Sequence, residues 1–394
     1  MKNITDLNGV YASGIHCGIK PKDKDLAFIY VPDAYSSAGV FTKNRFAAPC
    51  VSYTKNCLKK TTLKAVIINS GNANAATGKL GEVNNKKIAQ SAAKCLGLSS
   101  SQVGVASTGI IGEQLPIELI TKGVNSLLKD PLVKQGGLAA KSILTTDTRT
   151  KTVFVQKKVN NKTIYIAGMS KGVGMIAPNM ATTLSFLVTN ARIEKKFLQE
   201  ALIEAVNNSF NIMSVDTDTS TNDMVLILST GEEQCQISSV SERSAFKELL
   251  LEACEDFTKQ IISDAEGATK FIEAKVKGAV NKKQAQIVAR NIINSPLIKT
   301  SVYGGDPNWG RVVMAAGKDP NVKMDLNKTD LSFGNKQILK QGSLVPSLDI
   351  KGLKKYLKGK TIIIEVNLNI GQADAKAWGC DMSEQYIALN TEYS

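Results

Sequence analysis

Apolar residues along this 394-residue chain follow strand-like and helix-like periods in mixed order. The run LKAVIINS (63–70) predicts a buried strand, and NNKKIAQSAAKCLGL (84–98) has the apolar spacing of an amphipathic helix. The segments KTVFVQKKV and KTIYIAGM lie on either side of Asn160–Asn161, which is a turn signal. The two segments and the turn between them therefore predict a β-hairpin.

The second half of the chain continues the same mixture. A β-branched run that opens at MATT (180–183) predicts a strand ending near Val188. We also expect helices near 194–208, 241–264 and 282–294, strands near 223–230, 271–280, 329–340 and 361–370, and a short helix between the last two strands. Internal repeats and low-complexity tracts are absent from the sequence. The pattern indicates an α/β or α+β class with antiparallel hairpins.

Composition places the chain among ordinary globular proteins, with 43% hydrophobic and 21% charged residues. The opening MKNITDLNGVYASG lacks the apolar core of a signal peptide, and no window approaches the roughly 18 apolar residues of a membrane span. We therefore expect a cytoplasmic protein that does not enter the membrane. The seven cysteines are scattered without a CxxC pair, so we expect reduced thiols and neither a disulfide framework nor a zinc site.

The net charge of +14 raises the question of nucleic-acid binding. Lysines are spread along the whole chain, and only IKGLKKYLKGK (350–360) clusters them. That cluster predicts one amphipathic helix with a solvated face, and it lacks the series of aromatic residues that stacks on bases. The distribution argues against a nucleic-acid partner. An enzyme for anionic metabolites accounts for the sign of the charge equally well.

Few groups that activate nucleophiles are present. The chain has one histidine, His16, so a Ser-His-Asp or Cys-His site must use that residue or not exist. A single histidine beside glycine and cysteine is more often structural, and zinc binding by a histidine cluster is excluded by the count. The glycine loops match neither GxGxxG after a strand nor GxxxxGK[ST], and nothing supports pyridoxal or flavin chemistry.

The segment KGVGMIAPNMATTLSF (171–186) offers a different nucleophile. A threonine freed at a chain's N-terminus carries its own base, because its α-amine has a pKa near ~7.7–8.0 and can accept the Oγ proton. Cleavage of the Ala181–Thr182 bond would create that amine, and a loop held by Pro178 could supply the strain. The alternative is that Thr182 and Thr183 are ordinary strand residues, which β-propensity alone favours.

The same segment resembles the self-cleavage segment of the ornithine acetyltransferases, also called glutamate N-acetyltransferases, which act in arginine biosynthesis. Similar blocks occur in the family's order from end to end: AGVFTKNRFAAP (38–49), INSGNANAATG (68–78), STGIIGEQLP (107–116), LTTDT (144–148), SVDTDTSTND (214–223), GDPNWGR (305–311) and CDMSEQYIALNTEYS (380–394). There are departures: Ala76 stands where many relatives have cysteine, Thr217 where glycine is common, and Ser394 where relatives often end in Thr-Thr.

The resemblance implies a role for each matching residue. Thr182 would be the nucleophile and acetyl carrier after cleavage between Ala181 and Thr182. The oxyanion hole would consist of the Thr108 hydroxyl and the Gly109 backbone N–H. The implied substrate-binding set is Thr145, Lys171, Thr182, Glu266, Asn390 and Ser394. Lys171 suits a substrate carboxylate and Glu266 the ornithine side-chain ammonium, although alone they would be a solvated loop charge and a helix-end residue.

The implied reaction is ping-pong transfer of acetyl from N2-acetylornithine to glutamate, without a cofactor or metal. Some relatives also take acetyl from acetyl-CoA, and the sequence leaves open whether this chain does, as it leaves open inhibition by arginine. Two alternatives remain: a related self-processing N-terminal-nucleophile aminopeptidase, in which water is the acceptor, and a non-enzymatic binding protein.

The implied fold is an αββα-like sandwich resembling the N-terminal-nucleophile hydrolases. We expect it over residues 1–285, with a smaller C-terminal α/β domain over 286–394. Cleavage would give an α chain, 1–181, and a β chain, 182–394. Relatives assemble as αβ pairs that dimerise further, so α2β2 is the expected assembly.

Overall fold

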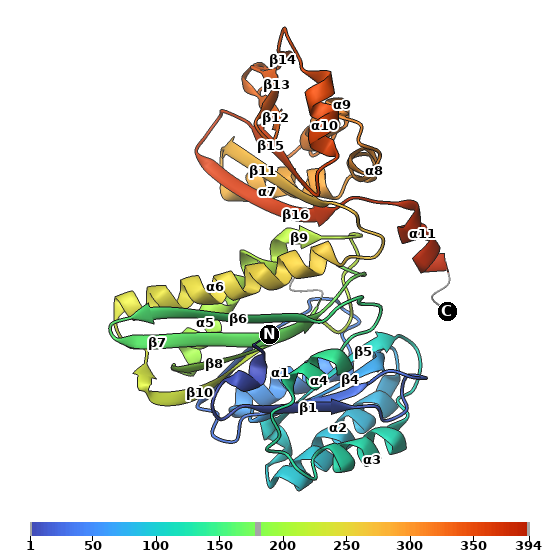
Figure 1. Cartoon of the computed structure of the whole chain (residues 1–394), viewed down its shortest axis with the longest axis vertical. Coiled ribbons are helices and arrows are strands. Elements are labelled where there is room, and N and C mark those ends of the chain that lie inside the picture. Colours follow the sequence, from blue (N-terminus) through green and yellow to red (C-terminus); the bar gives the residue numbers. More distant parts are fainter. Residues whose placement is uncertain (1, 178–182, 392–394) are drawn as a thin grey trace. The chain divides into compact units, whose positions relative to one another are not determined.

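The computed structural model describes residues 2–177 and 183–391 and contains two compact units (Figure 1). The first, here called the sandwich unit, comprises Met1–Gly172, Pro178–Asn211 and Thr219–Ile261. The second, the C-terminal unit, comprises Val173–Ala177, Ile212–Asp218 and Ile262–Ser394. The chain therefore passes between the units several times, and each unit is described by itself below.

The sandwich unit holds two sheets. The four-stranded sheet has the order β1-β2-β4-β5, in which β4 and β5 are parallel and the other neighbours antiparallel. Its strands are β1 (Tyr11–Ile15), β2 (Leu26–Tyr30), β4 (Ala65–Asn72) and β5 (Val103–Ile110). The five-stranded sheet has the order β3-β10-β8-β7-β6, with β3 (Ser36–Phe41), β6 (Lys151–Val159), β7 (Lys162–Lys171), β8 (Leu184–Arg192) and β10 (Met224–Gln236).

The expected hairpin is confirmed as β6 and β7. They pair in register from Lys151–Ser170 to Val159–Lys162. The two residues between them, Asn160 and Asn161, have φ angles of 46° and 62°. Asparagine tolerates this left-handed backbone, which a two-residue turn between twisted strands requires.

The two faces of the five-stranded sheet pack differently. Met224, Leu226 and Leu228 alternate along β10 and belong to the hydrophobic core shared with the four-stranded sheet. On the opposite face, a Cβ added at Gly168 of β7 would lie 3.0 Å from Cζ of Phe257, which belongs to α6 (Val240–Ser263). Alternation of side chains across the strands thus separates a sheet-facing core from a helix-facing core.

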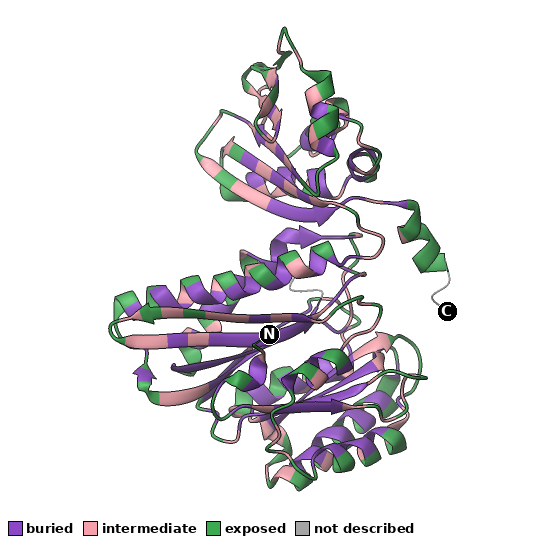
Figure 2. Cartoon of the chain, viewed as in Figure 1, coloured by how far each residue is buried: buried purple, intermediate pink, exposed green. Residues whose placement is uncertain are grey.

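Helices complete the layers of this unit (Figure 1). α5 (Lys195–Asn207) and α6 cover the five-stranded sheet, while α2 (Gly78–Leu96) and α3 (Ile117–Leu127) cover the four-stranded one. α1 (Pro49–Lys60) contacts both sheets through β5 and β3, and α4 (Gly136–Ser142) packs against β1 and β2. Figure 2 shows buried and exposed residues alternating along α6, as expected for a helix with one packed face. The order of layers confirms the αββα-like fold.

The C-terminal unit has one mixed sheet with its own core. The strand order is β14-β13-β12-β15-β11-β16-β9, with β9 (Met213–Ser214), β11 (Phe271–Ala279), β12 (Asp330–Phe333), β13 (Lys336–Lys340), β14 (Ser343–Leu344), β15 (Thr361–Asn367) and β16 (Ala373–Cys380). Its helices are α7 (Lys282–Ile293), α8 (Pro296–Gly304), α9 (Trp309–Gly317), α10 (Ile350–Leu357) and α11 (Glu384–Thr391).

The expected domain boundary at residue 285 lies inside α7, whereas the last crossing of the chain between the units falls between Ile261 and Ile262. α7 packs against β11 and β16, so its buried Ala285, Val288 and Ile292 share the core of the C-terminal unit. Across residues 2–177 and 183–391, every helix is too short or too polar to cross a membrane.

Candidate active site

The sequence-predicted oxyanion residues lie near the end of one strand, and Lys171 lies at the end of another. Thr108 and Gly109 are among the last three residues of β5, and Lys171 is the last residue of β7. Lys171 pairs with Leu184, the first residue of β8. The predicted cleavage-site residues Ala181 and Thr182, and the predicted substrate contact Ser394, lie outside the described residues.

Lys171 contacts Thr108, the first of the two predicted oxyanion residues, directly. Its Nζ donates a hydrogen bond to Oγ1 of Thr108 over 3.2 Å. A hydroxyl oxygen that accepts from an ammonium keeps its own proton available for donation to another oxygen. The pair can therefore present both a positive charge and an O–H donor to an oxyanion.

Gly109 cannot carry a side chain where it stands. Its φ is +132°, and a Cβ there would lie 2.2 Å from the backbone carbon of Gly71 and 2.4 Å from the backbone nitrogen of Asn72. The pairing of β4 with β5 is irregular at this point, because Asn72 opposes both Thr108 and Ile110. Glycine at such an irregularity permits a close approach of two backbones and leaves its N–H uncovered by a side chain.

A second lysine, which the sequence analysis did not single out, borders this irregularity. A Cβ added at Gly71 would lie 2.8 Å from Cγ of Lys20, and the Lys20 Nζ donates to the Leu144 carbonyl over 3.1 Å. Burial lowers the pKa of Lys20, and the nearby charge of Lys171 lowers it further, against the opposing effect of Asp23 and Asp25. The strand end at Gly109 is therefore flanked by two amines.

The loop that carries Lys20 is fixed by a buried carboxylate. Asp25 accepts hydrogen bonds from four successive backbone N–H groups, those of Cys17, Gly18, Ile19 and Lys20, at 2.6 to 3.1 Å. The histidine in this region, His16, has Nδ1 2.7 Å from the Asp23 carbonyl and 3.2 Å from Asp25. These contacts tie His16 to the loop and give it a structural role.

Asp147 connects two of the predicted substrate-binding residues. Its carboxylate accepts from the Gly172 N–H at 2.8 Å, beside Lys171, and from the Thr145 N–H at 3.1 Å. It also forms an ion pair with Lys151 at 2.6 Å, and both side chains are fully buried. Burial by itself raises the pKa of Asp147, but Lys171 and Lys151 outweigh it and hold that pKa below its ordinary value.

A row of buried hydroxyls begins at the first described residue after the predicted nucleophile. Oγ1 of Thr183 lies 2.9 Å from Oγ of Ser185, which lies 2.7 Å from Oγ of Ser170. All three residues are at most 3% exposed. Hydrogen bonding along this row satisfies the hydroxyls and fixes the beginning of β8 against the end of β7.

Two further predicted substrate residues meet in the C-terminal unit. The Asn390 side-chain amide donates to Oε2 of Glu266 over 3.2 Å. The backbone N–H of Glu266 donates to the Val173 carbonyl over 3.0 Å, and a Cβ added at Gly174 would lie 2.4 Å from the same Oε2. Glycine at position 174 thus leaves room for the carboxylate. The structure places Thr108, Gly109, Thr145 and Lys171 in one unit, and Glu266 and Asn390 in the other.

A carboxylate in the C-terminal unit holds the chain a few residues before the predicted cleavage site. Asp216 accepts from the N–H groups of Met175 at 2.6 Å, Ile176 at 2.7 Å and Asp218 at 3.2 Å. Two non-glycine residues here are left-handed, Met175 with φ 56° and Thr217 with φ 73°. The latter is the position where relatives commonly have glycine, and such a conformation is costly for a β-branched residue.

The residues that the sequence analysis did not single out are Lys20, Asp147 and Asp216. The two aspartates lie inside the quoted blocks LTTDT and SVDTDTSTND, which was their only signal. In residues 2–177 and 183–391, no three His, Cys, Asp or Glu side chains are grouped so that they could hold a metal ion.

Comparison with known proteins identifies the family. A family model described as the ArgJ family matches residues 11–394. The chain belongs to the ArgJ family. It is 41% identical to the arginine biosynthesis bifunctional protein ArgJ of Dehalococcoides mccartyi, over 100% of this chain and 97% of that protein. It is 40% identical to the ArgJ protein of Bacillus subtilis, over 99% of this chain and 96% of that one.

A solved ArgJ structure is also similar. The crystal structure of ArgJ from Bacillus halodurans has 40% sequence identity and a TM-score of 0.52, and the match covers 54% of this chain and 100% of that one. The family expected from the sequence motifs is therefore confirmed, and with it an acyltransferase of arginine biosynthesis.

Proposed function

We infer that the protein is a glutamate N-acetyltransferase that moves the acetyl group of N2-acetylornithine to glutamate. Membership of the ArgJ family over nearly the whole chain carries this inference. The geometry at the end of β5 supports it, because Thr108, Gly109 and Lys171 offer donors and a positive charge to the oxyanion that acyl transfer creates.

In the proposed first half-reaction, Oγ of Thr182 attacks the acetyl carbonyl carbon, and the Thr182 α-amine takes the Oγ proton. The tetrahedral oxyanion is stabilised by the Thr108 hydroxyl and the Gly109 N–H. The carbon–nitrogen bond to ornithine then breaks, and the α-ammonium returns a proton to the leaving nitrogen. In the second half-reaction, the amine of glutamate attacks the acetyl-threonine ester, and the same steps run in reverse.

The working enzyme requires a prior cleavage of its own chain. Oγ of Thr182 attacks the Ala181 carbonyl carbon, and the carbon–nitrogen bond breaks, so that the amide becomes an ester and the α-amine is freed. Water then hydrolyses the ester, which leaves a carboxylate on Ala181 and restores the Thr182 hydroxyl. The contacts of Asp216 support this step, because they fix the backbone at Met175 and Ile176 a few residues before the scissile bond. Residues 182–394 would make up 54% of the chain, the same share that matches the Bacillus halodurans structure.

Substrate recognition follows the roles that the resemblance implies for single residues. Lys171 would pair with a substrate carboxylate and Glu266 with the ornithine side-chain ammonium, while Thr145 and Asn390 would add hydrogen bonds. Ser394 would contribute from the end of the chain. We propose further that the two fragments remain together, assemble as α2β2 and act in the cytoplasm.

One experiment tests the function and its acyl donor. The purified protein is incubated with N2-acetylornithine plus glutamate, and separately with acetyl-CoA plus glutamate, and N-acetylglutamate is measured in each mixture. Product in the first mixture is expected, and product in the second would show that acetyl-CoA is also a donor. If neither mixture gives N-acetylglutamate, and the protein releases free amino acids when it is incubated with peptide amides instead, the aminopeptidase alternative is favoured.

A further inference from the structure

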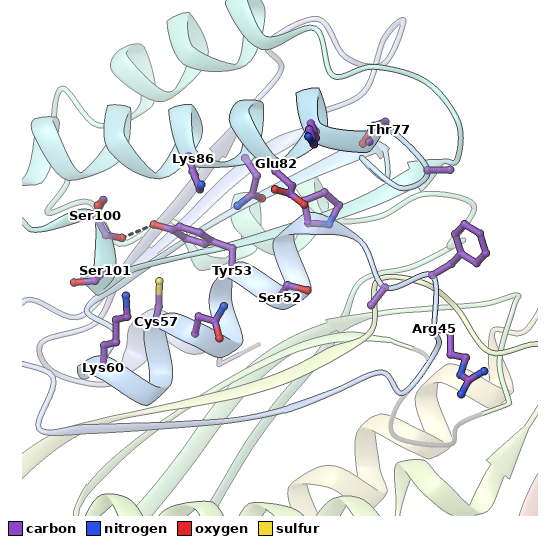
Figure 3. Close-up of a pocket in the computed structure, with 18 residues that line it drawn as sticks. Arg45, Ser52, Tyr53, Cys57, Lys60, Thr77, Glu82, Lys86, Ser100 and Ser101 are labelled. Carbon is purple, nitrogen blue, oxygen red and sulfur yellow. Dashed lines mark hydrogen bonds between the residues drawn. The ribbon is translucent and has the colours of Figure 1, made fainter.

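A pocket of about 830 Å³ lies in the sandwich unit between α1 and α2, and none of the residues assigned to acetyl transfer lines it (Figure 3). α1 contributes Tyr53 and Lys60, α2 contributes Lys79 and Lys86, and the lining continues to Ser100 and Ser101. The volume is within the range of about 300–1,000 Å³ typical of small-molecule sites.

The charges of the pocket are unbalanced. Four cationic side chains line it, those of Arg45, Lys60, Lys79 and Lys86, against the single carboxylate of Glu82. Within the described part of the chain, none of these five side chains forms an ion pair, although the protein has many elsewhere. Cations that outnumber the acidic groups around one hollow favour an anionic occupant.

The N-terminus of a helix opens into the same pocket. α2 is 19 residues long and begins at Gly78, and its cap residue Thr77 makes no side-chain capping hydrogen bond. The Thr77 hydroxyl instead donates to Oδ1 of Asn74 over 2.8 Å. Nothing lies within 4 Å of the Cβ position of Gly78, so the first residue of the helix is uncovered. Uncapped N–H groups and the helix dipole together favour a negatively charged group, phosphate above all.

A buried amide in the lining lacks partners. Asn85 lies on α2, lines the pocket and is 1% exposed. Neither its Oδ1 nor its Nδ2 has a hydrogen-bond partner among the described residues. Leaving a buried amide without partners is unfavourable, so such groups usually have a ligand, water or protein partner. This amide is independent of the surface charges and indicates a polar occupant.

We propose that this pocket binds a phosphate-bearing small molecule of nucleotide size. A phosphate group would sit at the N-terminus of α2 beside Lys79, and Asn85 would hydrogen-bond to the ligand. Lys60 and Lys86 extend positive charge toward Ser100 and Ser101, away from the Thr77 end, so an elongated ligand with more than one anionic group fits best (Figure 3). The exposed ring of Phe46 and the ring of Tyr53, whose hydroxyl donates to the Ser100 carbonyl, offer surfaces for a flat heterocycle.

Calorimetric titration of the full-length protein tests the proposal with three probes: inorganic pyrophosphate, ADP and coenzyme A. Binding of pyrophosphate as tightly as the others would overturn the nucleotide-sized ligand, because the site would then recognise phosphates alone. Tighter binding of ADP or coenzyme A would support the proposal and distinguish a nucleotide from a coenzyme A derivative. We expect dissociation constants to rise about 3- to 10-fold in Lys79→Ala and in Lys86→Ala, the loss typical of one partly exposed charge-assisted contact. Affinity should also weaken with added salt.

Lys94→Ala is the matched control, because Lys94 is an exposed lysine in the last turn of the same helix and does not line the pocket. It should leave binding unchanged. Asn85→Ala should weaken binding without lowering the thermal midpoint, because it removes a buried amide that has no partners. If none of the three probes binds at concentrations up to about 10 mM, the proposal is overturned, because a dissociation constant above that concentration is too weak for a specific site. Binding that Lys79→Ala, Lys86→Ala and Asn85→Ala leave unchanged would overturn it as well.

Discussion

Replacing Asp147 with asparagine is the most informative single change in the sandwich unit. The Asp147 carboxylate is fully buried, pairs with buried Lys151 at 2.6 Å and accepts the N–H groups of Gly172 and Thr145. Asparagine has nearly the same shape but no charge. The substitution therefore keeps the packing and removes the negative charge from between two lysines, Lys151 and Lys171.

The expected cost follows from the burial of Lys151. Removing one partner of a buried ion pair typically destabilises a protein by about 3–5 kcal/mol, because the other charge stays in a poorly solvated place. Asparagine can still accept one hydrogen bond, so Asp147→Asn should lower the free energy of unfolding by about 3 kcal/mol. Asp147→Ala should lower it by an amount at the upper end of that range. The free energy of unfolding of a domain is only about 5–15 kcal/mol, so either substitution would remove a large fraction of it.

The effect also has a predicted dependence on pH. The folded state holds the pKa of Asp147 below its ordinary value, chiefly because the nearby lysines outweigh burial. Its contribution to stability is therefore fully present above the unfolded pKa of about 3.9 and is lost as the pH falls through the lower folded pKa. The difference between wild type and Asp147→Asn should be constant near neutral pH and shrink below about pH 4.

Urea unfolding followed by far-ultraviolet circular dichroism measures this difference. Both tryptophans, Trp309 and Trp378, lie in the C-terminal unit, so their fluorescence reports on the wrong part of the molecule. The matched control is Glu204→Gln, which breaks a surface pair with Lys247 at 2.7 Å and should cost at most about 1 kcal/mol. If Asp147→Asn cost no more than Glu204→Gln, the buried pair would not stabilise the unit and the reasoning would fail.

Four further predictions concern the reaction itself. Thr182→Ala should remain one polypeptide on a denaturing gel where wild type gives two, and an intact yet active wild type would contradict self-processing. Thr108→Ala should lower kcat by roughly 10²–10³, the usual loss for one oxyanion donor, with a smaller change in KM, and an unchanged kcat would remove Thr108 from the site. Asp216→Asn should slow fragment formation in a time course of the refolded precursor, because one carbonyl oxygen replaces a carboxylate that accepts three N–H groups, whereas Asp218→Asn, a change to an exposed side chain in the same turn, should not. Activity should rise with pH through the α-amine pKa, at or below about pH 8, and His16→Gln should retain this rise; loss of turnover in a folded, cleaved His16→Gln protein would identify histidine as the base instead.

The elements that the sequence predicted correctly are those whose signal is local. β6 and β7 alternate around an Asn-Asn turn, and α2 and α5 carry apolar residues at helical spacing. Boundaries were less accurate: α2 begins at Gly78 and not at 84, and β8 and β10 continue past the expected ends to Arg192 and Gln236. At these ends the strands gain partners across the sheet, which a local pattern does not contain.

The first three strands were missed because their signal is weak or not local. β2 (LAFIY) is buried at all five positions and therefore does not alternate. β1 (YASGI) and β3 (SSAGVF) are rich in serine, glycine and alanine, which have little strand propensity. Gly39 explains the composition of β3, because a Cβ there would lie 2.6 Å from Leu58 of α1 and 2.8 Å from Leu226 of β10. Close packing between distant parts of the chain selects these small residues.

The residues of the candidate site also divide into those that the sequence predicted and those that only the structure shows. Family motifs located Thr108, Gly109 and Lys171, but Lys20 reaches this region through its approach to Gly71 and its contact with Leu144, which is 124 residues away in the chain. No spacing rule predicts such a contact, since it depends on how β1, β4 and β5 are arranged. Resemblance could assign roles to residues, whereas the fold was needed to show which neighbours position them.

The sheet topology also determines whether the two fragments can separate after cleavage. The proposed cut after Ala181 falls between β7 and β8, which are neighbours in one sheet and pair from Lys171–Leu184 to Ile166–Thr189. On the other side of the same sheet, β3 of the first fragment pairs with β10 of the second from Phe41–Met224 to Ser36–Ser229. Strands β8 and β10 of the second fragment thus lie between strands of the first, and both fragments supply side chains to one buried core. Separation would expose that core and two strand edges, so the proposed cut would free the Thr182 amine and leave the two fragments together.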